Sequence, residues 1–157
     1  MKEEIIYQKY LERLRIKLIK KYDQLGLRAS GDYANQLEAS VTSTTMIMFG
    51  AFHSQFMEHG RSSGGWPPRS AIENWIEAKK GLPSIFLEKK KQFAFLIARK
   101  IATEGIKVPN KYNTGKVIES VVNDFLGNDI QEMIKDLGMI WLPRIKSDII
   151  NILKQAA

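Results

Sequence analysis

Two histidines and the serines beside them are the first candidates for chemistry in this chain. His53 is followed directly by Ser54, and His59 by Ser62 three residues later. A serine paired with a histidine in a pocket can attack an acyl group, because the imidazole accepts the hydroxyl proton. Neighbours of this kind are abundant by chance, so we interpret both histidines as structural or exposed. A toxin or small hydrolase built on these histidines is one hypothesis for function, and it ranks below the two that are introduced later.

Carboxylates offer two further kinds of site. Glu58, Glu73 and Glu77 could form an acid/base pair, but we expect Glu73 to cap a helix and Glu77 to lie at the surface. Four other acidic residues have helical spacing without the loop of an EF-hand, and we interpret them as a solvated face: Asp124, Asp129, Glu132 and Asp136. With no cysteine and two histidines, the chain lacks the ligands of most zinc sites. We expect no catalysis, no metal and no cofactor.

The most informative stretch runs from Phe56 to Pro68 and reads FMEHGRSSGGWPP. Its glycines precede prolines instead of a helix, which rejects a phosphate-binding P-loop. A glycine-rich loop between an aromatic segment and a stiff Pro-Pro pair can reach a neighbouring protein, and tryptophan is a common interface anchor. Arg61 could pair with Glu58, or with a carboxylate or phosphate across an interface. The predicted interface comprises Glu58, Gly60, Arg61, Gly64, Gly65, Trp66, Pro67 and Pro68.

In their order, these motifs resemble the head–tail connector family of tailed bacteriophages, which are tail-completion, neck or minor tail proteins. In that family an aromatic-rich segment ends in Glu-x-Gly-Arg, followed by a Gly-rich loop and a Pro-Pro pair. A short helix with a Trp and a helix of the type Phe-Ala-x-x-Ile-Ala-Arg-Lys-Ile, ending in Gly, come next. Here the Trp is Trp75, and residues 93–105 read FAFLIARKIATEG. The resemblance covers about residues 45–105, with Ser62-Ser63 where Gly or Pro is more usual.

The resemblance implies a non-enzymatic structural protein of the virion, located at the head–tail junction or in the tail and synthesised in the host cytoplasm. It further implies a ring-type homo-oligomer around the DNA channel. Its partners would be other virion proteins, namely a portal or adaptor ring, the tail tube or tail proteins. Non-specific contact with packaged DNA is also expected of such a ring.

Net charge provides the alternative hypothesis, a basic nucleic-acid-binding module. The chain of 157 residues carries a net charge of +7, and residues 61–107 hold ten basic and four acidic residues, a net +6. Such asymmetry is typical of a surface that meets a polyanion or an acidic protein, although a solvated surface is at least as common. The residues predicted to face DNA or an acidic surface are Lys89, Lys90, Lys91, Arg99 and Lys100.

The residue patterns predict one α+β domain over residues 1–157, whose helices and strands must position these residues. A long N-terminal helix occupies residues 1–28, with an apolar stripe through Leu11, Leu14 and Leu18. Residues 35–60 hold a β-hairpin with its turn near Ser43 and an aromatic segment. Residues 61–69 form the Gly/Pro interface loop, and residues 70–157 are helical. No apolar run is long enough to span a membrane.

Within the helical part, Ser70 and Glu73 predict a capping box, and Ser84 predicts the cap of a helix over 85–104. Trp75 and Leu96 are expected in the core, since they fall on apolar helix faces. Two C-terminal helices are predicted over 116–126 and 129–153. Gly127 should separate them, and Gly138 and Pro143 should kink or break the second.

Overall fold

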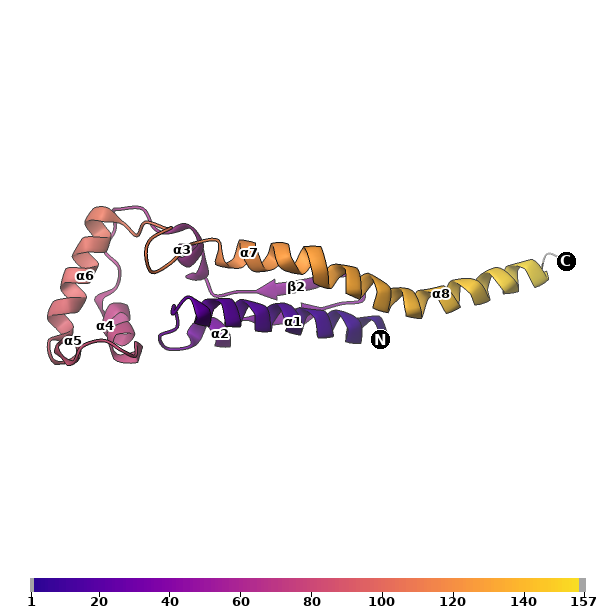
Figure 1. Cartoon of the computed structure of the whole chain (residues 1–157), viewed down its shortest axis with the longest axis horizontal. Coiled ribbons are helices and arrows are strands. Elements are labelled where there is room, and N and C mark those ends of the chain that lie inside the picture. Colours follow the sequence, from indigo (N-terminus) through magenta and orange to yellow (C-terminus); the bar gives the residue numbers. More distant parts are fainter. Residues whose placement is uncertain (1, 156–157) are drawn as a thin grey trace.

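The computed structural model describes residues 2–155, which form an elongated body with a small helical lobe at one end (Figure 1). The body is built from α1 (Lys2–Gln24), β1 (Glu38–Val41), β2 (Met46–Phe49), α7 (Val117–Asp124), the π-helix η1 (Phe125–Asp129) and α8 (Ile130–Gln155). The lobe consists of α4 (Arg69–Ala78), α5 (Ser84–Glu88) and α6 (Lys90–Glu104). Of two further short helices, α2 (Asp32–Asn35) follows α1 in sequence, and α3 (Ser54–His59) lies between β2 and α4. The predicted α+β class, with a long N-terminal helix, a small antiparallel sheet and then helices, is confirmed.

α1 is the element against which the rest of the body packs. It contacts α7, α8 and both strands, and its stripe buries Leu11, Leu14 and Leu18 as predicted. Tyr10 is the most deeply buried residue of the helix. Facing side chains of α7, η1 and α8 complete one apolar core. The body is therefore a helix pair with a hairpin packed against α1.

Ion pairs run along the same helix contact. Lys9 binds Asp136 at 2.8 Å, and Arg13 binds Glu132 at 2.7 Å. Lys17 bridges two further carboxylates, those of Asp124 and the buried Asp129. The acidic residues expected to form a solvated face therefore lie against the basic face of α1 and are paired with it.

The hairpin has the predicted position and turn. Its register pairs Glu38 with Phe49 and Val41 with Met46, and the Thr42 N–H donates to the Thr45 carbonyl oxygen at 2.8 Å across the turn. Val41 and Met46 pack on the body core. The opposite face remains uncovered, because Phe49 is 52% exposed. A two-stranded sheet is marginal by itself, so this hairpin depends on α1 for its stability.

Several predicted boundaries are wrong. The helix predicted over 85–104 is divided at Lys89 into α5 and α6. Neither Ser70 nor Ser84 caps a helix, because Pro68 and Pro83 occupy the N-cap positions of α4 and α5. A proline at the cap needs no N–H partner there and sets φ for helix entry. Gly127 does not separate two helices either, since it lies inside η1, which joins α7 to α8 without a break.

α8 continues through Pro143 and bends about its middle (Figure 1). Proline removes one backbone hydrogen bond and crowds the preceding turn, which accounts for a bend without ending the helix. The helix thus divides at its bend into a half that packs on the body and a half that projects beyond it (Figure 1).

We predict that acid destabilises the fold through the ion pairs of α1. Hydrogen bonds from Lys17 and Lys9 lower the pKa of the Asp124 and Asp136 carboxyls, respectively. Their stabilisation is complete above the unfolded value of about 4 and is lost as pH falls through the folded values. Melting temperature followed by circular dichroism should be flat near neutrality and fall below about pH 4.

Asp136→Asn should weaken this acid dependence, because one of the depressed carboxyls is gone. The matched control is Asp148→Asn, since Asp148 forms no ion pair with any residue from 2 to 155. An acid transition of Asp136→Asn that matches the wild type would contradict the assignment.

A second prediction concerns Tyr33, whose ring stacks on Tyr22 at a centroid distance of 4.4 Å. Its hydroxyl is buried and finds no hydrogen-bond partner among the described residues, and burial raises its pKa to about 12. A buried unpaired hydroxyl costs free energy, so Tyr33→Phe should raise the free energy of unfolding by about 1 kcal/mol. Urea denaturation measures this change, with Tyr112→Phe at an exposed position as the neutral control. A loss of stability in Tyr33→Phe would show that the hydroxyl is bonded.

Candidate interface site

Two segments cross where the lobe meets the body, and they hold the predicted interface loop in place. The Arg61 N–H donates to the Ile106 carbonyl oxygen at 2.9 Å, and the Ile106 N–H donates to the Arg61 carbonyl oxygen at 2.7 Å. Each segment follows directly from a helix, α3 on one side and α6 on the other. We call this pair of backbone hydrogen bonds, with the glycines before it, the crossing.

Both segments enter the crossing through a glycine in nearly the same conformation. Gly60 has φ 79° and ψ −164°, and Gly105 has φ 73° and ψ −164°. A Cβ on Gly60 would lie 2.2 Å from the Ile106 carbonyl oxygen, and one on Gly105 would lie 2.2 Å from that of Arg61. Only glycine therefore fits at either position, for both backbone angle and space.

Glu58 joins the same place to the body. It is buried, and its carboxylate accepts the N–H groups of Ile118 and Glu119 at 2.9 and 2.8 Å. These are otherwise unpaired donors in the first turn of α7, and a carboxylate also complements the helix dipole there. Asn113 adds a further tie by donating to the Met57 carbonyl oxygen at 2.7 Å. Glu58 therefore has an internal structural role.

The loop after the crossing lies against α6. The Arg61 guanidinium donates to the Gly65 carbonyl oxygen at 2.7 Å, within the loop itself and away from Glu58. The Gly64 N–H donates to the Ala102 carbonyl oxygen at 2.8 Å. Pro67 and Pro68 then lead into α4. These bonds hold the glycine-rich loop in a single shape.

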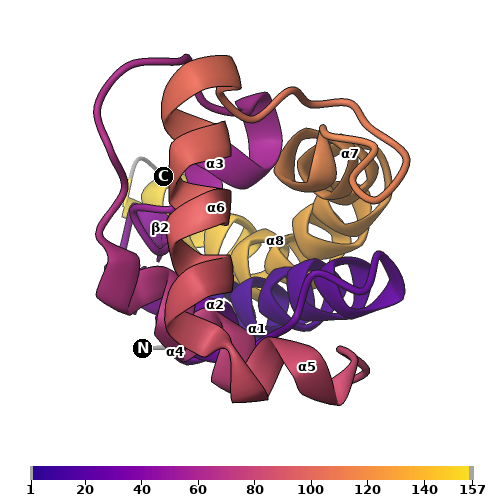
Figure 2. The same cartoon turned by 90° about the vertical axis from the view of Figure 1, so that its left-hand side faces the viewer.

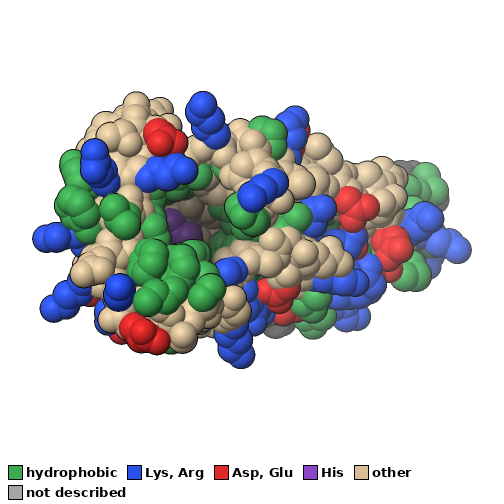
Figure 3. All heavy atoms as spheres, turned by 60° about the vertical axis from the view of Figure 1, so that its left-hand side comes forward, with side chains coloured by type: hydrophobic (Ala, Val, Ile, Leu, Met, Phe, Trp, Pro, Cys, Tyr) green, Lys and Arg blue, Asp and Glu red, His purple; other side chains and the backbone are tan. Residues whose placement is uncertain are grey.

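Trp66 lies at the end of this loop, and the centroid of its ring is 5.6 Å from the ring centroid of Phe95. The two side chains are 54% and 42% exposed, so they form an aromatic pair on the surface. We call them the Trp66–Phe95 pair. Figure 3 shows further hydrophobic side chains exposed over the lobe, beside a hollow in which a histidine is visible.

The lobe is organised by small residues of α6, and this placement overturns two core predictions. Ala94 and Ala98 are fully buried against Ile72 and Ile76 of α4. Alanines four residues apart let the two helices approach closely. Trp75 and Leu96, both predicted in the core, lie on outward faces with 39% and 54% exposure.

Among the described residues, no hydrogen bond joins either histidine to a serine or a carboxylate. His53 and His59 are exposed. His59 and Ser62 line a shallow hollow with Glu104 and Lys107. Residues 60–64 match the spacing G-x-S-x-G of a nucleophile elbow, but they follow helix α3 and lead into a loop, whereas the elbow is a turn between a strand and a helix.

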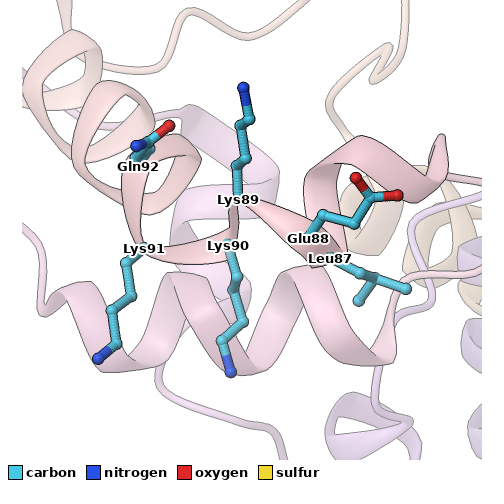
Figure 4. Close-up of a pocket in the computed structure, with 6 residues that line it drawn as sticks. All are labelled: Leu87, Glu88, Lys89, Lys90, Lys91 and Gln92. Atoms are coloured by element: carbon cyan, nitrogen blue, oxygen red, sulfur yellow. The ribbon is translucent and has the colours of Figure 1, made fainter.

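The predicted basic residues do not share one face. Figure 4 shows Lys89 pointing away from Lys90 and Lys91, around a depression at the start of α6. Lys90 pairs with Glu77. Arg99 and Lys100 are exposed further along the helix, and Lys100 lies 4.0 Å from Glu104.

Comparisons with protein-family models, curated proteins and solved structures find no match to this chain. Within residues 2–155, no group of three or more His, Cys, Asp or Glu side chains is placed to hold a metal ion. None of the helices described is both long and apolar enough to cross a membrane.

Alanine at either glycine of the crossing should be strongly destabilising. Gly60→Ala and Gly105→Ala each force an alanine into a backbone conformation with positive φ. Each also places the new Cβ against a carbonyl oxygen. We expect a loss of about 2–4 kcal/mol in the free energy of unfolding for each, measured by urea denaturation.

Gly65→Ala is the matched control, because Gly65 lies in the same loop and a Cβ there meets no atom within 4 Å. Its stability should stay within about 0.5 kcal/mol of the wild type. Equal stability of all three variants would refute the account of the crossing.

Proposed function

We propose that this chain is a non-enzymatic structural protein of a tailed-phage virion, acting in head–tail connection or tail completion. In this role it assembles as a ring of copies around the DNA channel. Its other partners are virion proteins, namely a portal or adaptor ring, the tail tube or tail proteins. The ordered motifs between residues 45 and 105 are the origin of this proposal, and the exposed Trp66–Phe95 pair is the observation that carries it.

The geometry of this aromatic pair supports a docking role. Trp66 belongs to a loop that is bonded to α6 through Gly64 and folded on itself through Arg61. A loop that is already ordered loses little conformational entropy when a partner binds. A half-exposed tryptophan at its end has the residue type and the setting of an interface hot spot. In an assembled ring, a neighbouring subunit or virion protein would cover it.

A second uncovered surface supports assembly into a larger particle. The outer face of the hairpin presents Ile47 and Phe49, which are 43% and 52% exposed, and the nearby Phe52 is 81% exposed. Both strands are also sheet edges, since the sheet has only two strands. Free edges with apolar side chains are sites of pairing with other chains.

The proposal is tested on purified particles of a phage that encodes this chain. Quantitative peptide mass spectrometry should find the protein at a fixed ratio to the portal or tail proteins. Trp66→Ala should reduce its incorporation and infectious titre at least tenfold while leaving its melting temperature unchanged, because the side chain is largely outside the core. Tyr112→Ala, at an exposed aromatic residue in another loop, is the control and should be neutral.

Absence of the protein from particles would refute the proposal. The alternative, a basic nucleic-acid-binding module, would then gain support from DNA binding that weakens steeply with salt and depends on Arg99 and Lys100.

A further inference from the structure

The projecting half of α8 is an apolar helix that meets the rest of the described chain near its own start, where Arg144 pairs with Glu3 of α1. Every residue from Trp141 to Gln155 is exposed, and eight large apolar side chains between residues 139 and 153 are each at least 40% exposed. Helices of about 15 residues are marginal in water without tertiary packing. We therefore expect this helix to be more stable when another helix packs against its apolar side chains.

The apolar residues follow a heptad pattern. Leu142, Ile145, Ile149 and Ile152 step by three, four and three residues, which is the a–d–a–d spacing of a coiled-coil core. Trp141 and Leu153 fall at the flanking g and e positions, so the apolar stripe is broader than a two-stranded seam requires. Pro143, at position b, points away from this stripe.

We propose that the projecting half of α8 assembles with the same segment of other copies of this chain into a parallel bundle of three or more helices. Leu at a with Ile at d, and Ile at both, are the core patterns that favour trimers and tetramers over dimers. This assembly is a property of the isolated chain and does not rest on the proposed function.

The area available fits a stable interface. Ile150, at position b, points away from the stripe. At roughly 100 Å² for each of the other seven half-exposed side chains, the stripe amounts to on the order of 700 Å², close to the roughly 800 Å² that each partner contributes to a standard interface. The same area exceeds the roughly 300–600 Å² of the largest apolar patch on a typical monomer. A second copy always offers the same stripe, and at matching length.

Charge decides the orientation. In an antiparallel pair, e positions face e positions and g positions face g positions of the second helix. Lys146, at position e, would then face Lys146 of the second copy, and Asp148, at position g, would face Asp148. Like charges placed opposite each other disfavour that pairing. In a parallel bundle Lys146, at position e, lies beside Trp141 of the next helix at position g, where its stem and ammonium group can cover the indole ring.

Sedimentation velocity and light scattering on the full chain test the assembly over a wide range of concentration. We expect the mass to rise from the 18.0 kDa monomer at least threefold. Ile145→Glu combined with Ile149→Glu should abolish this rise and leave the melting transition of the body unchanged. The matched control combines Ile16→Glu and Ile134→Glu, which are both 55% exposed on the body, and it should assemble like the wild type.

A single cysteine tests the orientation, since the chain has no cysteine of its own. Ile152→Cys should form a disulfide-linked dimer under mild oxidation, because equal positions meet in a parallel bundle. A wild type that stays monomeric or stops at a dimer would overturn the proposal. So would an assembly that survives the double glutamate variant, or a disulfide that forms only between Ile152→Cys and Leu142→Cys chains.

Discussion

The arrangement of this molecule depends on a close backbone contact at the crossing, where two helices end and two chain segments pass each other. Two hydrogen bonds of 2.9 and 2.7 Å are possible there only because Gly60 and Gly105 bring no side chain. Directly before it, Glu58 fixes α3 to the first turn of α7. The lobe is thus tied to the body through α3, and Lys79 of α4 adds a bond to the Arg28 carbonyl oxygen at 3.1 Å. Figure 2 shows the consequence: α6 stands across the end of the body, beginning beside α4 and α5 and ending beside α3.

Electrostatics divide the molecule in the same way. The basic residues of α1 bind carboxylates of α7, η1 and α8, so much of the positive charge of the body is compensated internally. Such exposed pairs contribute little each, but several along one contact also fix the register of the two helices. In the lobe, only some cations have acidic partners close by, such as Lys90 with Glu77. Positive potential toward a partner therefore belongs to the lobe more than to the long N-terminal helix.

Local patterns predicted the elements well, and long-range geometry explains where they failed. The leucine stripe of α1, the hairpin and the glycines that end α3 and α6 follow from neighbours in sequence, so they could be found there. Glu58 serves residues sixty positions away, and the carboxylates of α8 meet cations over a hundred positions away, which no local pattern reveals. Ser70 misled because Pro68 takes the cap position, and Trp75 because the buried alanines of α6 favour Ile72 and Ile76 over it. For the loop, composition favoured neither core nor interface for Trp66, and it could not reveal the bond from the Gly64 N–H to the Ala102 carbonyl oxygen, which joins residues far apart in sequence.

The molecule has well-packed cores and, at the same time, many large apolar side chains exposed at its surface. The body core and the lobe core are both closed, and the crossing joins them. Large apolar side chains nevertheless remain outside, on the hairpin, on the lobe and on the projecting half of α8. Holding Trp66 half exposed at the end of a well-bonded loop costs hydrophobic free energy relative to burying it. Under the proposed function, such ordered but exposed surfaces would be covered by other chains, and here they lie on three separate parts of the molecule: the hairpin, the lobe and the projecting half of α8.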